Sequence, residues 1–359
     1  ALSGKSVPAP TPVSLLGSLT RGRLVGRDQE LAEGRQLWRR ALDGHGHCVL
    51  ISGEPGAGKT RLGRELLVQA ALDGAVVLSG ACYEFEATTP YLPFVEMFRS
   101  WVHEQTDDAC LRDLLGESAS QLAKLVPELT ARLGPFPART ELGAQEERLL
   151  FADAVATVLA NLAGQRGLIL YIDDLHWADS STLWLLGRLL RHLREDKILV
   201  VSSYRETELA RVHPLGKALV DWNRERLITR IVLQRFDVDA TRAQLEALLG
   251  DDVSRDLAVA VHRETEGNPF FIEEVLKELV ERGKFVRRDG RWERPKTLEL
   301  RLPQSMKEAI GHRLDRLSED CNDMLRTAAV IGKTFGFDEL RSSSPDLSED
   351  TLLDFLDEA

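Results

Sequence analysis

Apolar and polar residues follow two different rhythms along the chain. Short, almost continuous apolar runs predict buried β-strands, and longer segments with apolar residues every three or four positions predict helices. The apolar runs fall at residues 47–52, 75–79, 168–172, 198–202 and 227–233. Buried strands that alternate with helices are typical of a parallel sheet covered on both faces. We therefore expect an α/β fold with a parallel five-stranded sheet in an αβα sandwich.

The pattern changes near Phe236. Beyond it the strand signal fades and helical patterns dominate, except at residues 285–292, where Asp289-Gly290 between β-type residues predicts a hairpin turn. At the start of the chain, prolines with little periodicity predict an extended linker. We expect four parts, which are a flexible linker at 1–22, a sheet domain at 23–235, a helical lid with a β-hairpin at 236–300 and a further helical domain at 301–359.

The composition fits a folded chain of more than one domain. With 359 residues the chain is longer than one hydrophobic core usually serves, and 43% hydrophobic residues supply ample core material. The net charge of −11 argues against a surface that binds nucleic acid throughout. No apolar run approaches the roughly 20 residues that span a bilayer, and four widely spaced cysteines without metal-type pairs favour a reducing cytoplasm. Because the chain begins at Ala1 and ends in an incomplete amphipathic pattern, we expect it to be part of a longer protein.

The most informative motif follows the first predicted strand. It matches the pattern G-x-x-x-x-G-K-[ST] at every fixed position and reads Gly53-Glu54-Pro55-Gly56-Ala57-Gly58-Lys59-Thr60. Glycines allow successive backbone N–H groups to curl around phosphates, and the helix expected from residue 59 adds the positive end of its dipole. Lys59 is expected to reach the β- and γ-phosphates, and the Thr60 hydroxyl to bind Mg²⁺. We predict a nucleotide-binding P-loop formed by this motif together with Arg61.

A second motif lies further along the chain. The apolar run at 168–172 ends in Asp173-Asp174, and a buried strand that delivers acids at its C-terminal end is the Walker B arrangement. We expect Asp173 to hold Mg²⁺ through water. Asp174 stands where many ATPases have a glutamate that activates the attacking water. Its side chain is one methylene shorter, which predicts slow hydrolysis, and Glu54 and Asp179 are the alternatives for positioning that water.

Other candidates are less specific. Arg205 follows the predicted strand at 198–202 and is either a reader of the γ-phosphate or a surface residue of a loop. No second residue stands at metal-ligand spacing from His176 and Trp177, so structural roles are preferred for this pair. The basic segment 284–296 is interpreted as a solvent-facing hairpin rather than a nucleic-acid site. The N-K-x-D motif that reads guanine does not occur in the sequence, which favours adenine.

Together these motifs resemble the STAND class of P-loop ATPases, within the AAA+-related group. The resemblance is strongest to the ATPase module of large bacterial LuxR-type (MalT-like) transcriptional regulators and of multidomain adenylate or guanylate cyclases. It covers residues from about 24 to 358. It rests on the order of five segments, which are the N-terminal motif at 24–31, the P-loop at 53–60, an extended Walker B at 171–179, the sensor strand end at 203–205 and the G-x-P segment at 267–274. Residues 302–317 and 328–332 further resemble the start of a winged-helix domain.

The resemblance adds roles for individual residues. It implies that Val25, Gly26 and Arg27 lie against the adenine. It implies that Pro269 packs near the adenine from the helical lid. It also favours Arg205 as the reader of the γ-phosphate.

A switching mechanism is implied by the same resemblance. The lid and a winged-helix domain at 301–359, cut short at the end of the chain, close over bound ADP and hold the protein inactive. An inducer or partner of unknown identity prompts exchange for ATP, after which the module opens and self-associates, and hydrolysis resets it. The implied cofactors are ATP or ADP with Mg²⁺. Contact with DNA is expected only through domains outside this chain.

Three functions stay open at this point. The first is a signalling ATPase with slow hydrolysis, the central module of a transcriptional regulator or, alternatively, of a cyclase. The second is an AAA+ motor or loader with fast ATP turnover, which would call for a Walker B glutamate and an arginine that faces a neighbouring subunit. The third is a scaffold that keeps ADP permanently without hydrolysing ATP. Turnover and nucleotide exchange separate the three.

Overall fold

The computed structural model describes residues 24–84, 89–136, 143–209, 213–281, 286–288, 291–293, 311, 314, 317–331, 336–345 and 347–358. Four predictions therefore lie wholly or partly outside the described residues. They concern the linker at 1–22, the hairpin turn at Asp289-Gly290, the basic segment 284–296 and the start of the domain expected from residue 301.

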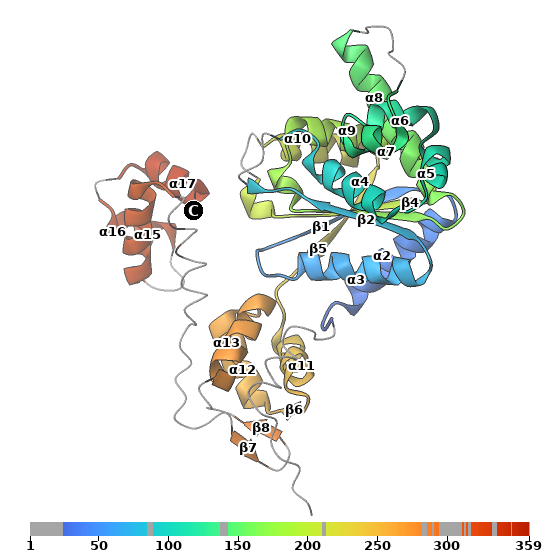
Figure 1. The fold of residues 1–359 in the computed structure, drawn as a ribbon. Coiled ribbons are helices and arrows are strands. Elements are labelled where there is room, and N and C mark those ends of the chain that lie inside the picture. Colours follow the sequence, from blue (N-terminus) through green and yellow to red (C-terminus); the bar gives the residue numbers. More distant parts are fainter. Residues whose placement is uncertain are drawn as a thin grey trace, which may run out of the picture.

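A parallel sheet of five strands forms the centre of the molecule (Figure 1). Its strands are β1 (His47–Gly53), β2 (Val76–Ala81), β3 (Leu168–Asp173), β4 (Ile198–Tyr204) and β5 (Ile228–Leu233), in the spatial order β2-β3-β4-β1-β5. The predicted α/β class and the predicted five-stranded sheet are confirmed. Because all five strands run in the same direction, the loops that follow β1, β3 and β4 open side by side at one edge of the sheet.

Alternate residues of each strand face opposite layers of helices. On β1, Val49 and Ile51 belong to one buried cluster, whereas Cys48 and Leu50 belong to another on the opposite face. This alternation follows from the two-residue period of a strand, and it explains why strands covered on both faces read as continuous apolar runs. The helices of the first layer are α2 (Asp28–Leu42) and α3 (Lys59–Leu72), and those of the second layer are α4 (Leu92–Glu104), α8 (Ala144–Ala163), α9 (Ser180–His192) and α10 (Pro214–Arg224) (Figure 1).

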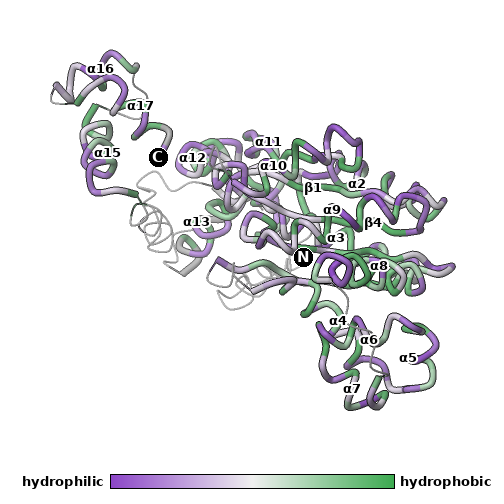
Figure 2. Tube along the Cα trace, turned by 90° about the horizontal axis from the view of Figure 1, so that it is seen from above, coloured by the Kyte–Doolittle hydropathy of each residue, from purple (hydrophilic) through white to green (hydrophobic). Residues whose placement is uncertain are grey.

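The connection between β2 and β3 carries an additional group of short helices. The apolar pattern predicts a long helical region over residues 91–162, broken by a loop at 134–137. The structure divides its described part with α5 (Asp108–Leu115), the 3-10 turn η2 (Gly116–Ser118), α6 (Ala119–Leu122) and α7 (Glu128–Leu133) between α4 and α8. The break before α5 is fixed by Asp107, which accepts a hydrogen bond from the backbone N–H of Ala109 at 2.8 Å. In Figure 2 this group lies at the opposite end of the molecule from the C-terminal helices.

A second core follows the sheet. It is formed by α11 (Val238–Leu249), β6 (Asp252–Val253), α12 (Arg255–Thr265), α13 (Pro269–Glu281) and β8 (Arg291–Glu293), and β7 (Val286–Arg288) pairs with β8. We call residues 236–293 the helical lid. The strands β7 and β8 pair antiparallel, as the hairpin prediction requires, whereas the parallel pairing of β6 with β8 has no counterpart in the sequence prediction. The lid has its own buried cluster, so it packs as a separate unit beside the sheet domain.

Three helices near the C-terminus form a further small cluster. They are α15 (Glu319–Ile331), α16 (Phe337–Ser343) and α17 (Glu349–Glu358), and they stand apart from the sheet in both Figure 1 and Figure 2. Cys321, Met324, Leu340 and Leu352 are buried between them. The winged-helix identity of this part stays a prediction. Among the helices in the described parts of the chain, none is long and apolar enough to cross a membrane.

Candidate nucleotide site

The loop between β1 and α3 has the conformation that a phosphate cradle needs. Gly56 and Gly58 have φ angles of +81° and +95°, a region that side-chain-bearing residues rarely adopt, and Gly58 directly precedes the first turn of α3. Lys59, the first residue of α3, is 6% exposed and its Nζ donates to the carbonyl oxygens of Gly53 at 2.9 Å and Glu54 at 3.0 Å. Burial lowers the pKa of Lys59 to about 8, and the nearby positive charge of Arg205 acts in the same direction.

The first Walker B acid is held by three hydroxyl groups from different elements. Asp173, at the end of β3, accepts hydrogen bonds on Oδ1 from Thr60 of α3 at 3.2 Å and from the Tyr171 hydroxyl at 2.7 Å, and from the Ser203 hydroxyl of β4. A hydroxyl and a carboxylate at one point, beside a phosphate cradle, are the hard oxygen donors that Mg²⁺ prefers. The described residues contain no group of three acidic, histidine or cysteine side chains that would bind a metal by itself. Thr60 and Asp173 therefore fit a magnesium ion that is completed by phosphate oxygens and water.

Asp174 faces the cavity directly beside this acid. Its backbone has a left-handed φ of +51°, and its N–H donates to the Ser203 hydroxyl at 3.0 Å. Burial and the neighbouring charge of Asp173 raise the pKa of Asp174, while Arg205 and Lys59 oppose that rise. The carboxylate is one-third exposed, so a water molecule can reach it.

The two alternative acids are occupied elsewhere. Glu54 forms an ion pair with Arg235 at 2.7 Å. Asp179 caps α9 by accepting hydrogen bonds from the N–H groups of Ser181 at 2.7 Å and Thr182 at 3.1 Å. Of the three acids that the sequence offers for positioning water, Asp174 is the one that lines the cavity.

Arg205 follows β4 and lines the same cavity. Its guanidinium donates to Glu208 at 2.6 Å, and its Nε lies 3.9 Å from Asp174 Oδ1. His176 is buried beside Asp174 and Glu208, and the centre of its ring lies 5.1 Å from the centre of the Trp177 ring.

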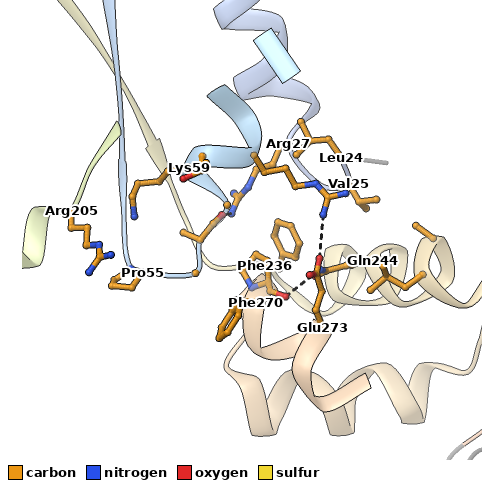
Figure 3. A pocket seen from close by; sticks show the side chains of 18 of the residues that line it. Leu24, Val25, Arg27, Pro55, Lys59, Arg205, Phe236, Gln244, Phe270 and Glu273 are labelled. Atoms are coloured by element: carbon orange, nitrogen blue, oxygen red, sulfur yellow. Dashed lines mark hydrogen bonds and ion pairs between the residues drawn. The ribbon is translucent and has the colours of Figure 1, made fainter. Parts of the chain in front are cut away.

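A cavity of about 320 Å³ extends from the P-loop toward the lid (Figure 3). Lys59 and Arg205 lie at one end, and Leu24 and Val25 lie at the other (Figure 3). This size is at the lower end of the range for small-molecule sites. The apolar end, which the sequence assigned only to the N-terminal motif and Pro269, is also lined by Phe236, Ala247 and Leu248. An end rich in phosphate-binding groups opposite an apolar end suits a nucleotide.

Arg27 joins three segments rather than presenting its charge to the cavity. Its guanidinium donates to the carbonyl oxygens of Ala57 at 3.1 Å and Gln234 at 2.6 Å, and it lies 4.6 Å from the centre of the Phe236 ring. Arg27 is 5% exposed, and burial lowers its pKa. Arg27 lines the cavity, and its hydrogen bonds go to backbone carbonyls and to Glu30.

The lid is hydrogen-bonded to the P-loop. Asn268 donates from its side chain to the Pro55 carbonyl at 2.9 Å, and the N–H of Phe270 donates to the Gly56 carbonyl at 3.3 Å. Between them, Pro269 lines the cavity. A Cβ atom on Gly56 would lie 2.6 Å from the Asn268 side-chain oxygen, so a glycine is needed here for lid contact as well as for backbone conformation.

Sequence reasoning missed the wall that α11 contributes. Gln244, Ala247 and Leu248 line the cavity at a spacing of three and four residues, the face of one helix. Gln244 donates to the Pro269 carbonyl at 3.2 Å and to Glu273 at 3.3 Å, and Glu273 pairs with Arg61 at 3.2 Å. The pattern of α11 is that of any amphipathic helix, so nothing in it marked these positions. Glu273 stands within the G-x-P segment, which was the available signal.

Parts of the chain match known protein families. Residues 23–201 match the family described as AAA ATPase domain, and residues 239–287 match a domain of unknown function. An uncharacterized protein of Rhizobium meliloti (strain 1021) is 26% identical over 362 residues, a match that covers 94% of this chain and 32% of that protein. The chain thus spans about a third of the length of this curated relative.

Two solved structures are similar over most of the chain. A Walker-type ATPase of Pyrococcus abyssi has a TM-score of 0.54 at 14% identity, and the match covers 93% of this chain and 89% of that one. A STAND protein with a tetratricopeptide repeat sensor from Pyrococcus horikoshii has a TM-score of 0.38 at 15% identity, over 93% of this chain and 39% of that one. The first of these structures shares the fold of this chain, and the family match concerns residues 23–201.

Proposed function

We propose that the chain is an ATP- and ADP-binding switch with slow ATP hydrolysis, the regulatory module of a larger protein. The observation that carries this proposal is the composition of the cavity wall, which is shared between the sheet domain and the helical lid. Because both the sheet domain and the helical lid line the cavity, a nucleotide in it contacts the two units at once. Asn268 and Phe270 also join the lid directly to the P-loop. The contacts of the nucleotide can therefore bias the position of the lid.

The phosphate end supplies the parts for hydrolysis in this proposal. Lys59 holds the β- and γ-phosphates, Thr60 and Asp173 hold Mg²⁺, and Asp174 orients the attacking water. Arg205 exchanges its bond with Glu208 for one to the γ-phosphate, so it distinguishes ATP from ADP. Magnesium, when bound, neutralises the charge that develops on the phosphate oxygens.

The aspartate at position 174 supports a switch over a fast motor. Its carboxylate reaches less far into the cavity than a glutamate would, and it is near three charged side chains, Arg205, Lys59 and Asp173. The attacking water molecule is therefore held less closely to the γ-phosphate, and the ATP-bound state lasts longer. Slow turnover is a property that a signalling state requires and that a motor cannot use.

We further propose that the module belongs to a multidomain bacterial regulator. A transcriptional regulator of the LuxR/MalT-like type is our first choice, and a multidomain cyclase is the alternative. The match to about a third of a much longer bacterial protein supports a role as one module among several. In this proposal the ATP state self-associates, and any contact with DNA is made by other domains.

The test is to denature the purified chain and identify the released nucleotide by chromatography. We expect ADP in near one-to-one amount from the wild type and none from Lys59→Ala. Lys217→Ala is the matched control, because Lys217 is an exposed lysine of α10 away from the cavity. An unloaded wild type that turns over added ATP rapidly would overturn the switch in favour of a motor. Bound ADP that never exchanges would favour the scaffold.

A further inference from the structure

The cluster behind the cavity has a feature that the proposed function does not use. His176 is only 1% exposed in its side chain, yet neither of its ring nitrogens makes a hydrogen bond. Buried polar atoms without partners are rare in folded proteins and call for an explanation. Each ring nitrogen of His176 instead lies near a carboxylate oxygen without forming a hydrogen bond to it.

Two carboxylates flank the imidazole. Nδ1 lies 3.9 Å from Asp174 Oδ1, and Nε2 lies 3.5 Å from Glu208 Oε2. Asp174 lines the cavity, whereas Glu208 does not, and Glu208 instead accepts the hydrogen bond from Arg205. Arg205 also lies 3.9 Å from Asp174, so the four side chains form a closed ring.

The imidazole is neutral at this place. Burial, together with the positive charges of Arg205 and Lys59, lowers the pKa of His176 to about 3. A neutral imidazole carries one N–H and one unprotonated nitrogen. It can therefore donate to one of the two carboxylates but not to both at the same time.

We propose that His176 is a positioning residue that directs its single proton to Asp174 or to Glu208 according to where Arg205 is bound. The proposal rests on the proposed function, because it requires Arg205 to leave Glu208 for the γ-phosphate. While Arg205 neutralises Glu208, Asp174 is the stronger hydrogen-bond acceptor of the two carboxylates. The imidazole proton then resides on Nδ1 and is donated to Asp174. A carboxylate oxygen that accepts from His176 is then less able to take a proton from water.

The arrangement reverses when Arg205 binds the γ-phosphate. Glu208 loses its partner and becomes the better acceptor, so the imidazole gives up the proton on Nδ1 and takes up one on Nε2. The two transfers are to and from water by way of Asp174 and Glu208, which are both partly exposed, and the charge of the ring stays zero. Asp174 is released to accept a hydrogen bond from the attacking water. Hydrolysis is thereby primed only when the γ-phosphate is present.

A pair of substitutions separates the two proton positions. In His176→Asn the side-chain amide can take the place of Nδ1, and in His176→Gln it can take the place of Nε2, while both replace the ring by a polar group of similar chemistry. The first variant keeps a donor on Asp174 and the second keeps one on Glu208. We expect the asparagine variant to hydrolyse ATP at least about tenfold more slowly than the glutamine variant in single turnover, which is part of the roughly 10²- to 10⁴-fold that a positioned general base contributes. Both should bind ADP with unchanged affinity.

Equal rates for the two variants, or the reverse order, would overturn the proposal. Binding of ADP by each variant, measured by titration calorimetry, shows whether the site is intact. If the wild type neither binds nor hydrolyses ATP, the proposed function fails, and this inference fails with it. If the wild type hydrolyses ATP and the two variants behave alike, only the inference fails.

A measurement on the wild-type chain does not depend on variants that fold. The ¹⁵N chemical shifts of a histidine ring show which nitrogen carries the proton, and the His176 signal is the one missing in His176→Gln. We expect Nδ1 to be protonated with ADP and Nε2 with ADP and beryllium fluoride, which stands in for the γ-phosphate. A purely structural histidine would keep one tautomer in both states, and that result would contradict the proposal.

Discussion

The two ends of the cavity are built in opposite ways. At the phosphate end, the cradle comes from one short stretch of chain after β1, both acids stand at the end of β3, and Arg205 follows the neighbouring strand β4. At the apolar end, the wall is assembled from segments far apart in sequence, and its contacts span more than two hundred residues, as between Arg27 and Gln234. In the proposed switch, the first end stays fixed with the sheet, whereas the second opens when the lid moves. Chemistry then belongs to one end and regulation to the other.

The largest effect is expected at the rigid end, from Asp173→Asn. The change removes the charge that holds Mg²⁺ but keeps an oxygen for the hydroxyls of Thr60, Tyr171 and Ser203. We expect the single-turnover rate of ATP hydrolysis to fall by roughly 10²- to 10³-fold, the size of other losses of electrostatic stabilisation. A titration with Mg²⁺ should need far higher concentrations to reach the residual rate.

Asp179→Asn is the matched control for this change. It also removes one negative charge close to the Walker B strand, but from a helix cap. Its stability should fall by about 1 kcal/mol or less, with the Mg²⁺ dependence of hydrolysis unchanged. A similar loss of hydrolysis in both variants would contradict the assignment of Asp173 to the metal.

The next effect is a pH dependence that arises at the same end. Lys59 has a pKa lowered to about 8, and phosphates bind its protonated form. Below pH 8 the charge is already present, whereas above it each binding event must take up a proton. The affinity for ADP should therefore be flat below pH 7 and fall by up to about tenfold per pH unit above pH 8. Calorimetry in buffers of different ionisation enthalpy would measure the uptake directly.

The variant Lys59→Arg tests the origin of that pH dependence. An arginine stays charged throughout the accessible pH range. Its affinity should be lower overall because its larger group must fit the same cradle, but it should not fall between pH 8 and 9. A steep fall in this variant as well would assign the titration to another group.

At the mobile end, the expected effects are smaller and appear in release rather than in chemistry. Asn268 is 4% exposed and donates to the Pro55 carbonyl, so Asn268→Ala removes a buried link between lid and P-loop. A net loss of about 1 kcal/mol for such a bond corresponds to roughly fivefold faster dissociation of ADP. Stopped-flow displacement of a fluorescent ADP analogue measures it.

A suitable control for the lid contact is Asn161→Ala. Asn161 also donates from its side chain to a backbone carbonyl, that of Leu114, but on α8, where it plays no part in the cavity. Its ADP dissociation rate should match that of the wild type. If Asn268→Ala also left the rate unchanged, the lid would not be retaining the nucleotide.

The same difference between the two ends of the cavity explains which features could be predicted from the sequence. The five strands, the P-loop and the Walker B acids could be predicted because strand burial and phosphate chemistry impose local patterns on consecutive residues. The roles of Gln244 and Leu248 could not, because an amphipathic helix looks the same whether its face meets a core or a ligand. The closed ring of four side chains around His176 likewise depends on how the segments after β3 and β4 meet in space. No spacing along the chain records it.

The smallest effect is expected from the ion pair between Arg61 and Glu273. It joins α3 to α13 across the cavity at 3.2 Å, and Arg61 is about two-fifths exposed, so solvent screens the attraction. Glu273→Gln keeps the shape and an acceptor for Gln244 while removing the charge. Partly exposed pairs contribute about 0 to 1 kcal/mol, so ADP should dissociate no more than about fivefold faster. The difference from the wild type should shrink as salt is raised. A salt-independent difference would mean that Glu273 acts through its hydrogen bond to Gln244, and the lid would then be held by buried polar contacts rather than by charge.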